Sequence, residues 1–91
     1  MSAAEGWKDR LRNWPEDMPR RGVLITAFGE QIPFDNFSLS DTLVLLERHT
    51  PDMVGARKVM FPFEQILALK IVDVVKPKCL QAMGFKGSQP K

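Results

Sequence analysis

The stretch that most constrains the fold is RKVMFPFEQILALKIVDVV, residues 57–75, which is the longest apolar run in the chain. It is rich in β-branched residues, and one short interruption, Phe63-Glu64-Gln65, divides it. Two such runs around a tight turn are typical of an antiparallel strand pair. The sequence therefore predicts a strand from Arg57 to Phe61 or Pro62 and another from Ile66 to about Val75.

Three more strands are predicted ahead of this pair: GVLITAF (22–28), QIPFDNFSL (31–39) and TLVLLER (42–48). Gly29-Glu30 suits a two-residue type II′ hairpin turn, and Ser40-Asp41 suits the next turn. Pro33 cannot donate a ladder hydrogen bond, which places it at a strand start, an edge or a bulge. The third run is apolar on both faces, which implies a closed or strongly curled sheet, or a subunit interface. We expect a mainly β fold, a five-stranded, strongly bent antiparallel small barrel.

Short helices are predicted at both ends of this barrel. Trp7, Leu11 and Trp14 recur at helical spacing, so residues 3–14 read as an amphipathic helix that Pro15 ends. We expect the two indoles to cap an open end of the barrel, with stacking on nucleic acid as the alternative. The predicted organisation is a single domain of residues 1–91, with the barrel at 22–75, a short helix at 76–85 and a disordered tail at 86–91.

Composition indicates a small globular protein outside the membrane. Apolar residues make up 44% and charged residues 26%, and no run reaches the ~18 apolar residues that a membrane span needs. The amino terminus lacks the pattern of a secretory signal, and the single cysteine fits a reducing compartment, so we expect a cytoplasmic protein. A domain of this size buries only about 60–70% of its unfolded surface, so self-association would help its stability.

Catalytic, metal and cofactor sites are not indicated. The single histidine, His49, and the single cysteine, Cys79, fall short of the three or four ligands of a metal site. Cys79 stands beside apolar Leu80 and reads as an inert thiol. Gly22 and Gly29 are isolated, so no glycine-rich phosphate loop is present. We therefore expect a protein that is not an enzyme and uses no cofactor, metal or small-molecule substrate.

Charge is unevenly distributed along the chain. The net charge is only +2, yet residues 22–75 carry four bases against seven acids, whereas the part from Lys76 onward has four lysines and no acid. A phosphate-binding surface on the barrel would therefore have to be local. The pair Arg20-Arg21 reads as a solvated charge at the entry to a strand, with an anion contact as the alternative.

Five strands in meander order after an amino-terminal helix resemble the Sm/LSm family of small β-barrels, whose bacterial members include Hfq. GVLITAFGEQIPFDNFSLSDTLVLLER looks like the first motif of that family, and ARKVMFPFEQILALKI is similar to the second. The likeness spans about residues 22–72 and rests on the apolar skeleton. Other small barrels, such as Tudor-like or SH3-like folds, share this strand pattern.

The polar signature of the family is altered in this chain. Ser38 stands at the usual aspartate, Thr42 at the usual asparagine and Asn36 where glycine is common. Pro62-Phe63 replaces the Arg-Gly pair that shapes the nucleotide pocket. The fold of the family therefore carries over better than its ligand.

The resemblance implies a homo-oligomeric ring in which the fourth strand of one subunit pairs with the fifth strand of the next. An exposed apolar strand edge is an aggregation hazard unless it is paired, which favours the same arrangement on physical grounds. The expected interface residues are Val59, Met60, Phe61, Leu67, Leu69 and Ile71.

Two functions follow from these observations. The first is an Sm-like oligomer that binds single-stranded RNA at the turns after the second and fourth expected strands. The second is a protein-interaction or scaffold module that assembles through its strand edges, with Phe63 packed against a neighbouring subunit. The candidate RNA-binding residues are Ser38, Asp41, Arg48, Arg57, Lys58, Phe63 and Gln65.

Overall fold

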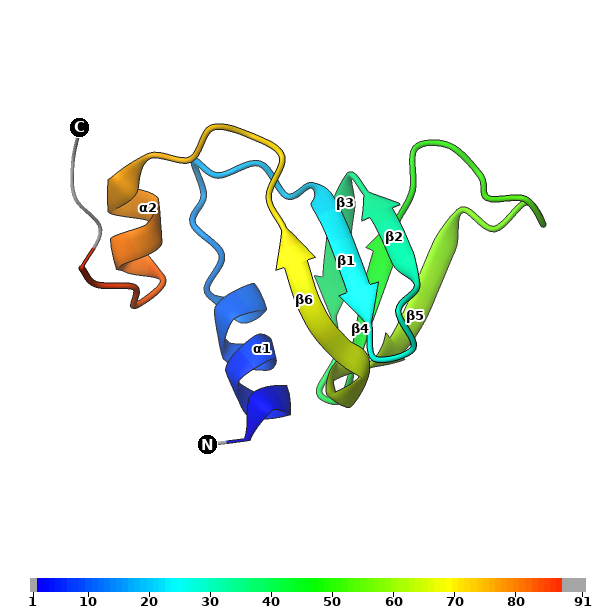
Figure 1. Ribbon diagram of the computed structural model, residues 1–91, viewed down its shortest axis with the longest axis horizontal. Coiled ribbons are helices and arrows are strands. Elements are labelled where there is room, and N and C mark those ends of the chain that lie inside the picture. Colours follow the sequence, from blue (N-terminus) through cyan, green and yellow to red (C-terminus); the bar gives the residue numbers. More distant parts are fainter. Residues whose placement is uncertain (1, 88–91) are drawn as a thin grey trace.

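The computed structural model describes residues 2–87, which form six strands in two three-stranded antiparallel sheets, with one helix near each end of the chain (Figure 1). The mainly β fold with its two terminal helices is confirmed. The number of strands and the closure of the barrel are corrected below. In chain order the elements are α1 (Ala3–Arg12), β1 (Gly22–Thr26), β2 (Gln31–Phe34), β3 (Asn36–Leu39), β4 (Leu43–Glu47), β5 (Lys58–Pro62), the 3₁₀ helix η1 (Phe63–Gln65), β6 (Ile66–Lys70) and α2 (Pro77–Ala82).

The strand order is β2-β1-β6 in one sheet and β3-β4-β5 in the other. In the first sheet Leu24 of β1 lies opposite Ile32 of β2 and Leu69 of β6. In the second, Val44 of β4 lies opposite Leu39 of β3 and Phe61 of β5. Both central strands alternate between buried and half-buried residues, as expected when one face of a strand turns to a core. Figure 1 shows β6, β1 and β2 side by side, with β3, β4 and β5 behind them.

The prediction of one strand over residues 31–39 is wrong, because the chain changes sheets at Asp35. The Asp35 amide donates to the Glu47 carbonyl at 2.9 Å, and the Asn36 side chain accepts from the Phe37 amide at 2.9 Å. The first half, β2, therefore pairs with β1, and the second half, β3, pairs with β4. Pro33 lies in β2, an edge strand of its sheet, as the sequence predicts.

The expected closed barrel is not found within residues 2–87, because β5 and β6 do not pair with each other. After β5, η1 carries the chain to the other sheet, where the Ala27 amide donates to the Gln65 carbonyl at 2.7 Å. The last strand also ends at Lys70 and not near Val75. Beyond it, Asp73 accepts two hydrogen bonds from Arg21, at 2.6 and 2.8 Å, which tie this segment to the residue just before β1.

A core of apolar side chains fills the space between the sheets and beneath α1. Phe37 lies at its centre, with the rings of Trp14 and Phe34 edge-on at centroid distances of 5.3 and 6.1 Å. The Arg20 guanidinium covers the Phe37 ring at 4.3 Å and donates to the Phe37 carbonyl at 3.1 Å. The buried apolar residues are Leu11, Trp14, Met18, Leu24, Ile32, Phe34, Phe37, Val44, Leu46, Phe63, Ile66, Cys79 and Met83.

Capping residues close to each helix in sequence define where α1 begins and where α2 begins and ends. Ser2 and Glu5 form a reciprocal capping box at the start of α1, which packs on η1 and β3. At the other end of the chain, Pro77 opens α2, and Gly84, with φ of 96°, ends it. Of the expected disordered tail, residues 88–91 lie outside the described part. Between residues 2 and 87, no helix combines the length and the apolar content needed to cross a membrane.

Candidate functional site: open strand edges, a polar end and an apolar pocket

The outer edges of β5 and β6 are open. Each strand has five residues, and each is the last strand of its sheet. Met60 on β5 is 65% exposed and Leu67 on β6 is 64% exposed, so each edge presents an apolar side chain to solvent. Of the other expected interface residues, Val59, Phe61, Leu69 and Ile71 are half-buried against the core.

Polar and rigid residues stand at the ends of these edges. Lys58 begins β5, Pro62 ends it, and Lys70 ends β6. Lysine and proline are residues with which proteins limit unwanted pairing of edge strands. The apolar part open to a partner strand is therefore short, residues 59–61 on β5 and 67–69 on β6.

The two turns that are expected to bind RNA meet at one end of the sheets. The Phe63 amide of η1 donates to the Thr42 carbonyl in the β3–β4 turn at 3.4 Å. In that turn the Ser40 hydroxyl accepts from the Leu43 amide at 2.9 Å, which fixes its shape. Lys8 of α1 reaches the same turn and donates to the Asp41 carbonyl at 2.6 Å. The fold thus adds a cation, Lys8, that the sequence analysis did not place there.

The aromatic ring expected at this end faces inward. Phe63 is only 3% exposed and belongs to the core of its own chain, where α1 covers η1. It can neither stack on a base nor pack into a neighbouring subunit without leaving that core. Gln65 is half-buried, and its side-chain oxygen is buried without a hydrogen-bond partner among residues 2–87.

The remaining expected RNA-binding residues do not join this group. Lys58 pairs with Glu47 in the ladder, and the Arg48 amide donates to the Arg57 carbonyl at 2.7 Å, so all three cations lie at the opposite end of β4 from the β3–β4 turn. Ser38 lies exposed within β3, opposite Leu45. The seven predicted residues therefore form two separate groups, with Ser38 between them.

The connection between β4 and β5 is organised by Asp52. Its carboxylate accepts from the amides of Ala56 and Val54 at 2.8 and 2.9 Å, and these bonds lower the pKa of Asp52 below its usual value. His49 in this loop is exposed, with Nδ1 3.6 Å from an Asp35 oxygen. No group of three or more His, Cys, Asp or Glu residues within 2–87 could hold a metal ion.

The single cysteine, Cys79, belongs to α2 and is buried. Burial, and then a 3.2 Å hydrogen bond donated to an Asp17 oxygen, raise the pKa of the Cys79 thiol. The same bond is the main cause of the lowered pKa of Asp17. Because only the thiolate is strongly nucleophilic, a thiol with a raised pKa is poorly suited to covalent catalysis.

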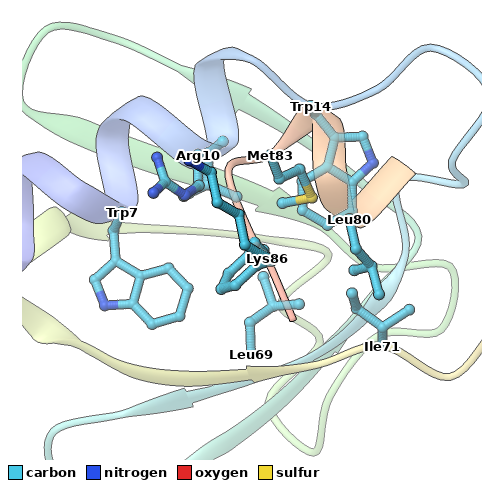
Figure 2. Close-up of a pocket in the computed structure, with 10 residues that line it drawn as sticks. Trp7, Arg10, Trp14, Leu69, Ile71, Leu80, Met83 and Lys86 are labelled. Atoms are coloured by element: carbon cyan, nitrogen blue, oxygen red, sulfur yellow. The ribbon is translucent and has the colours of Figure 1, made fainter. Parts of the chain in front are cut away.

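An apolar pocket of about 370 Å³ lies where α1, the end of β6 and the C-terminal segment meet. Figure 2 shows Trp7 and Trp14 at opposite ends of its lining, with Arg10 and Lys86 between them. The sequence analysis missed this pocket. One feature of the sequence could have indicated it: the C-terminal segment carries apolar residues, Leu80, Met83 and Phe85, which so short a helix cannot bury by itself. The lining residues are Trp7, Arg10, Leu11, Trp14, Leu69, Ile71, Leu80, Met83, Phe85 and Lys86.

No protein-family model matches this chain, and neither the curated proteins nor the solved structures include a significant match.

Proposed function

We propose that this chain is a non-enzymatic, Sm-like subunit that assembles with copies of itself through the open edges of β5 and β6. The observation that carries the proposal is the pair of unpaired edge strands, equal in length, each with one outward apolar side chain, Met60 or Leu67. Pairing β5 of one copy with β6 of the next would satisfy both rows of backbone groups and bury both side chains.

The course of the chain supports the likeness to Sm subunits. A single residue, Asp35, joins β2 to β3, so the six strands follow the five expected ones with the second strand bent into two. The strands then run β6-β1-β2 and, past the bend, β3-β4-β5. When β2 and β3 are counted as one bent strand, β5 and β6 are the fourth and fifth strands of the meander. These are the two strands that join subunits in Sm-like rings.

The geometry favours a heterologous contact, since the two edges belong to different strands. Head-to-tail pairing of unlike edges closes into a ring when the rotation between subunits allows it. Size-exclusion chromatography with light scattering tests the assembly directly. We expect a mass several times the 10.3 kDa of one chain. A single species of 10.3 kDa at high protein concentration would refute assembly.

Single-stranded RNA is the second candidate, as the ligand of the assembled form. The observation that favours it is the meeting of the β3–β4 turn with η1, which brings Asp41, Gln65 and Lys8 to one end of the subunit. Lys8 offers a cation for phosphate there, whereas the buried Gln65 oxygen would have to turn outward before it could accept a hydrogen bond from a base. With Phe63 buried, recognition of bases at this end would depend on hydrogen bonds.

A titration with labelled U-rich and A-rich single-stranded RNA at two salt concentrations tests this second candidate. Binding is expected to weaken as salt rises, because phosphate contacts release counterions. Lys8→Glu should reduce affinity several-fold, whereas Arg57→Glu, at the opposite end of the subunit, should leave it within twofold of the wild type. Absence of salt-sensitive binding at micromolar protein would leave the assembly module as the function.

A further inference from the structure

We propose that the apolar pocket between α1 and the C-terminal segment binds an amphiphilic carboxylate, a molecule with a flexible apolar chain and one anionic head. This site adjoins the end of β6, because Leu69 belongs to both, and it shares no lining residue with β5 or with η1. Its volume of about 370 Å³ falls within the range of roughly 300–1,000 Å³ that small-molecule pockets occupy.

The walls of the pocket suit an apolar chain. The N-terminal segment contributes the indoles of Trp7 and Trp14, and the end of β6 contributes Leu69 and Ile71. The C-terminal segment contributes Leu80, Met83 and Phe85. Three parts of the chain that are distant in sequence thus converge on one cavity (Figure 2). Mostly hydrophobic and aromatic walls with a few polar groups are typical of sites for small organic ligands.

The polar groups of the lining are cationic. Arg10 and Lys86 are the charged residues among the ten that line the pocket, and none of the ten is acidic. Arg10 is held in place, because it donates to Asp9 at 2.7 Å and its guanidinium lies 5.7 Å from the centre of the Phe85 ring. A guanidinium has five N–H donors, so Arg10 retains donors for a second anion. Lys86 forms no ion pair within residues 2–87 and is the more available cation.

These two features together select the ligand class. An uncharged apolar molecule would leave Lys86 without a counter-ion, and a small anion such as phosphate would leave the indoles and aliphatic side chains without a partner. A carboxylate on an apolar chain complements both, with its chain among the indoles and its head beside Lys86 and Arg10.

Tryptophan fluorescence reports on this site directly, because the chain contains only two tryptophans and both line the pocket. The test uses a bromine-tipped dodecanoate below its micelle concentration, since bromine quenches an indole that it contacts. We expect saturable quenching, and binding at least about threefold weaker for the bromine-tipped dodecanol, which lacks the charge. Quenching that does not saturate, or equal affinity for the alcohol, would overturn the proposal.

Charge reversal at the pocket provides the matched variant. Lys86→Glu should weaken the carboxylate about three- to tenfold, as expected for a partly exposed ion pair replaced by a repulsion. Lys70→Glu makes the same change of charge on an exposed residue outside the lining, and it should leave affinity unchanged. Equal affinities of the two variants would contradict the role of Lys86. Lys86 is exposed, so its replacement should also leave the unfolding temperature unchanged.

A second copy of the chain is the competing occupant of the pocket, and the same fluorescence distinguishes it. If a second copy filled the pocket, the tryptophan emission of ligand-free protein would shift on dilution, and dodecanoate would split the assembly. That result would overturn the ligand proposal. Emission that is independent of dilution, with an assembly that survives saturation by dodecanoate, supports it and leaves the edge-to-edge assembly to its own test.

Discussion

Phe37 shows at the scale of one residue how the fold is held together. It is 1% exposed, its ring makes T-shaped contacts with Trp14 and Phe34, and the Arg20 guanidinium lies over the same ring. The sequence analysis read Arg20 as a solvated charge, yet its guanidinium is engaged with this ring and with the Phe37 carbonyl. An arginine is expected to be exposed when only its neighbours in sequence are considered. That Arg20 covers an aromatic ring becomes visible only in the tertiary fold.

Arg21 and Asp73 carry the clearest pH dependence. Two hydrogen bonds from Arg21 lower the pKa of Asp73 below its usual 3.8. A carboxyl group with a lowered folded-state pKa stabilises the fold above its unfolded pKa, and this contribution is lost as pH falls through the folded pKa. The wild type should therefore lose unfolding temperature more steeply below about pH 4 than Asp73→Asn does.

Thermal unfolding followed by circular dichroism between pH 2 and 7 measures this difference. Arg21→Met serves as the control, because removing the donor should return the pKa of Asp73 toward its ordinary value and flatten the acid slope as Asp73→Asn does. Parallel acid slopes for the wild type and both variants would show that this ion pair does not contribute to acid sensitivity.

At the scale of elements, most of the boundaries that follow from local chemistry could be predicted from the sequence. Pro15 after the N-terminal helix, Ser40-Asp41 between strands, and Gly84 after α2 act within a few residues of themselves. The predicted two-residue hairpin at Gly29-Glu30 is wrong, because β1 already ends at Thr26, where the Gly29 amide donates to the Thr26 carbonyl at 2.9 Å and the turn takes in residues 27–30. The break at Asp35 could not be predicted, because a continuous strand and a strand that changes sheets show similar β propensity along the chain. Each half pairs with its neighbour along the chain, β2 with β1 and β3 with β4, so the break appears only in the pairing of the strands.

The capping box of α1 was readable from sequence as Ser2 followed three residues later by Glu5, but the sequence analysis did not use it. Ser2→Ala should lower the free energy of unfolding by about 1 kcal/mol, because the Glu5 amide then loses its acceptor. Ser38→Ala, at an exposed serine in β3, should change it by less than about 0.5 kcal/mol. Urea unfolding measures both. Equal effects of the two substitutions would mean that α1 does not depend on this cap.

At the scale of the whole molecule, the β-rich class could be predicted from the sequence. Whether the sheets close into a barrel, and where a pocket forms, depend on packing between distant parts of the chain. Alternation of apolar residues shows that strands have an inner face, but not whether the last strand returns to the first. Here β6 pairs with β1 but not with β5, so the sheets stay open between β5 and β6. The pocket arises because two short helices and the end of β6 meet in space, and no local pattern in the chain encodes that meeting.

The open edges make a specific demand on assembly. If β5 of one copy pairs with β6 of the next, a charge on either edge blocks one side of the subunit and leaves the other side intact. Met60→Asp blocks β5, and Leu67→Asp blocks β6, so each variant alone has no complete contact to form. Val54→Asp, at an exposed apolar residue in the β4–β5 loop, introduces the same charge away from both edges.

Mixing the two edge variants and measuring mass by light scattering is the most direct test of this account. Met60→Asp and Leu67→Asp should each run as a 10.3 kDa monomer, and their equimolar mixture should form a heterodimer of twice that mass through the one intact pair of edges. The Val54→Asp variant should assemble like the wild type. A mixture that stays monomeric, or single variants that keep the wild-type mass, would contradict pairing between β5 and β6.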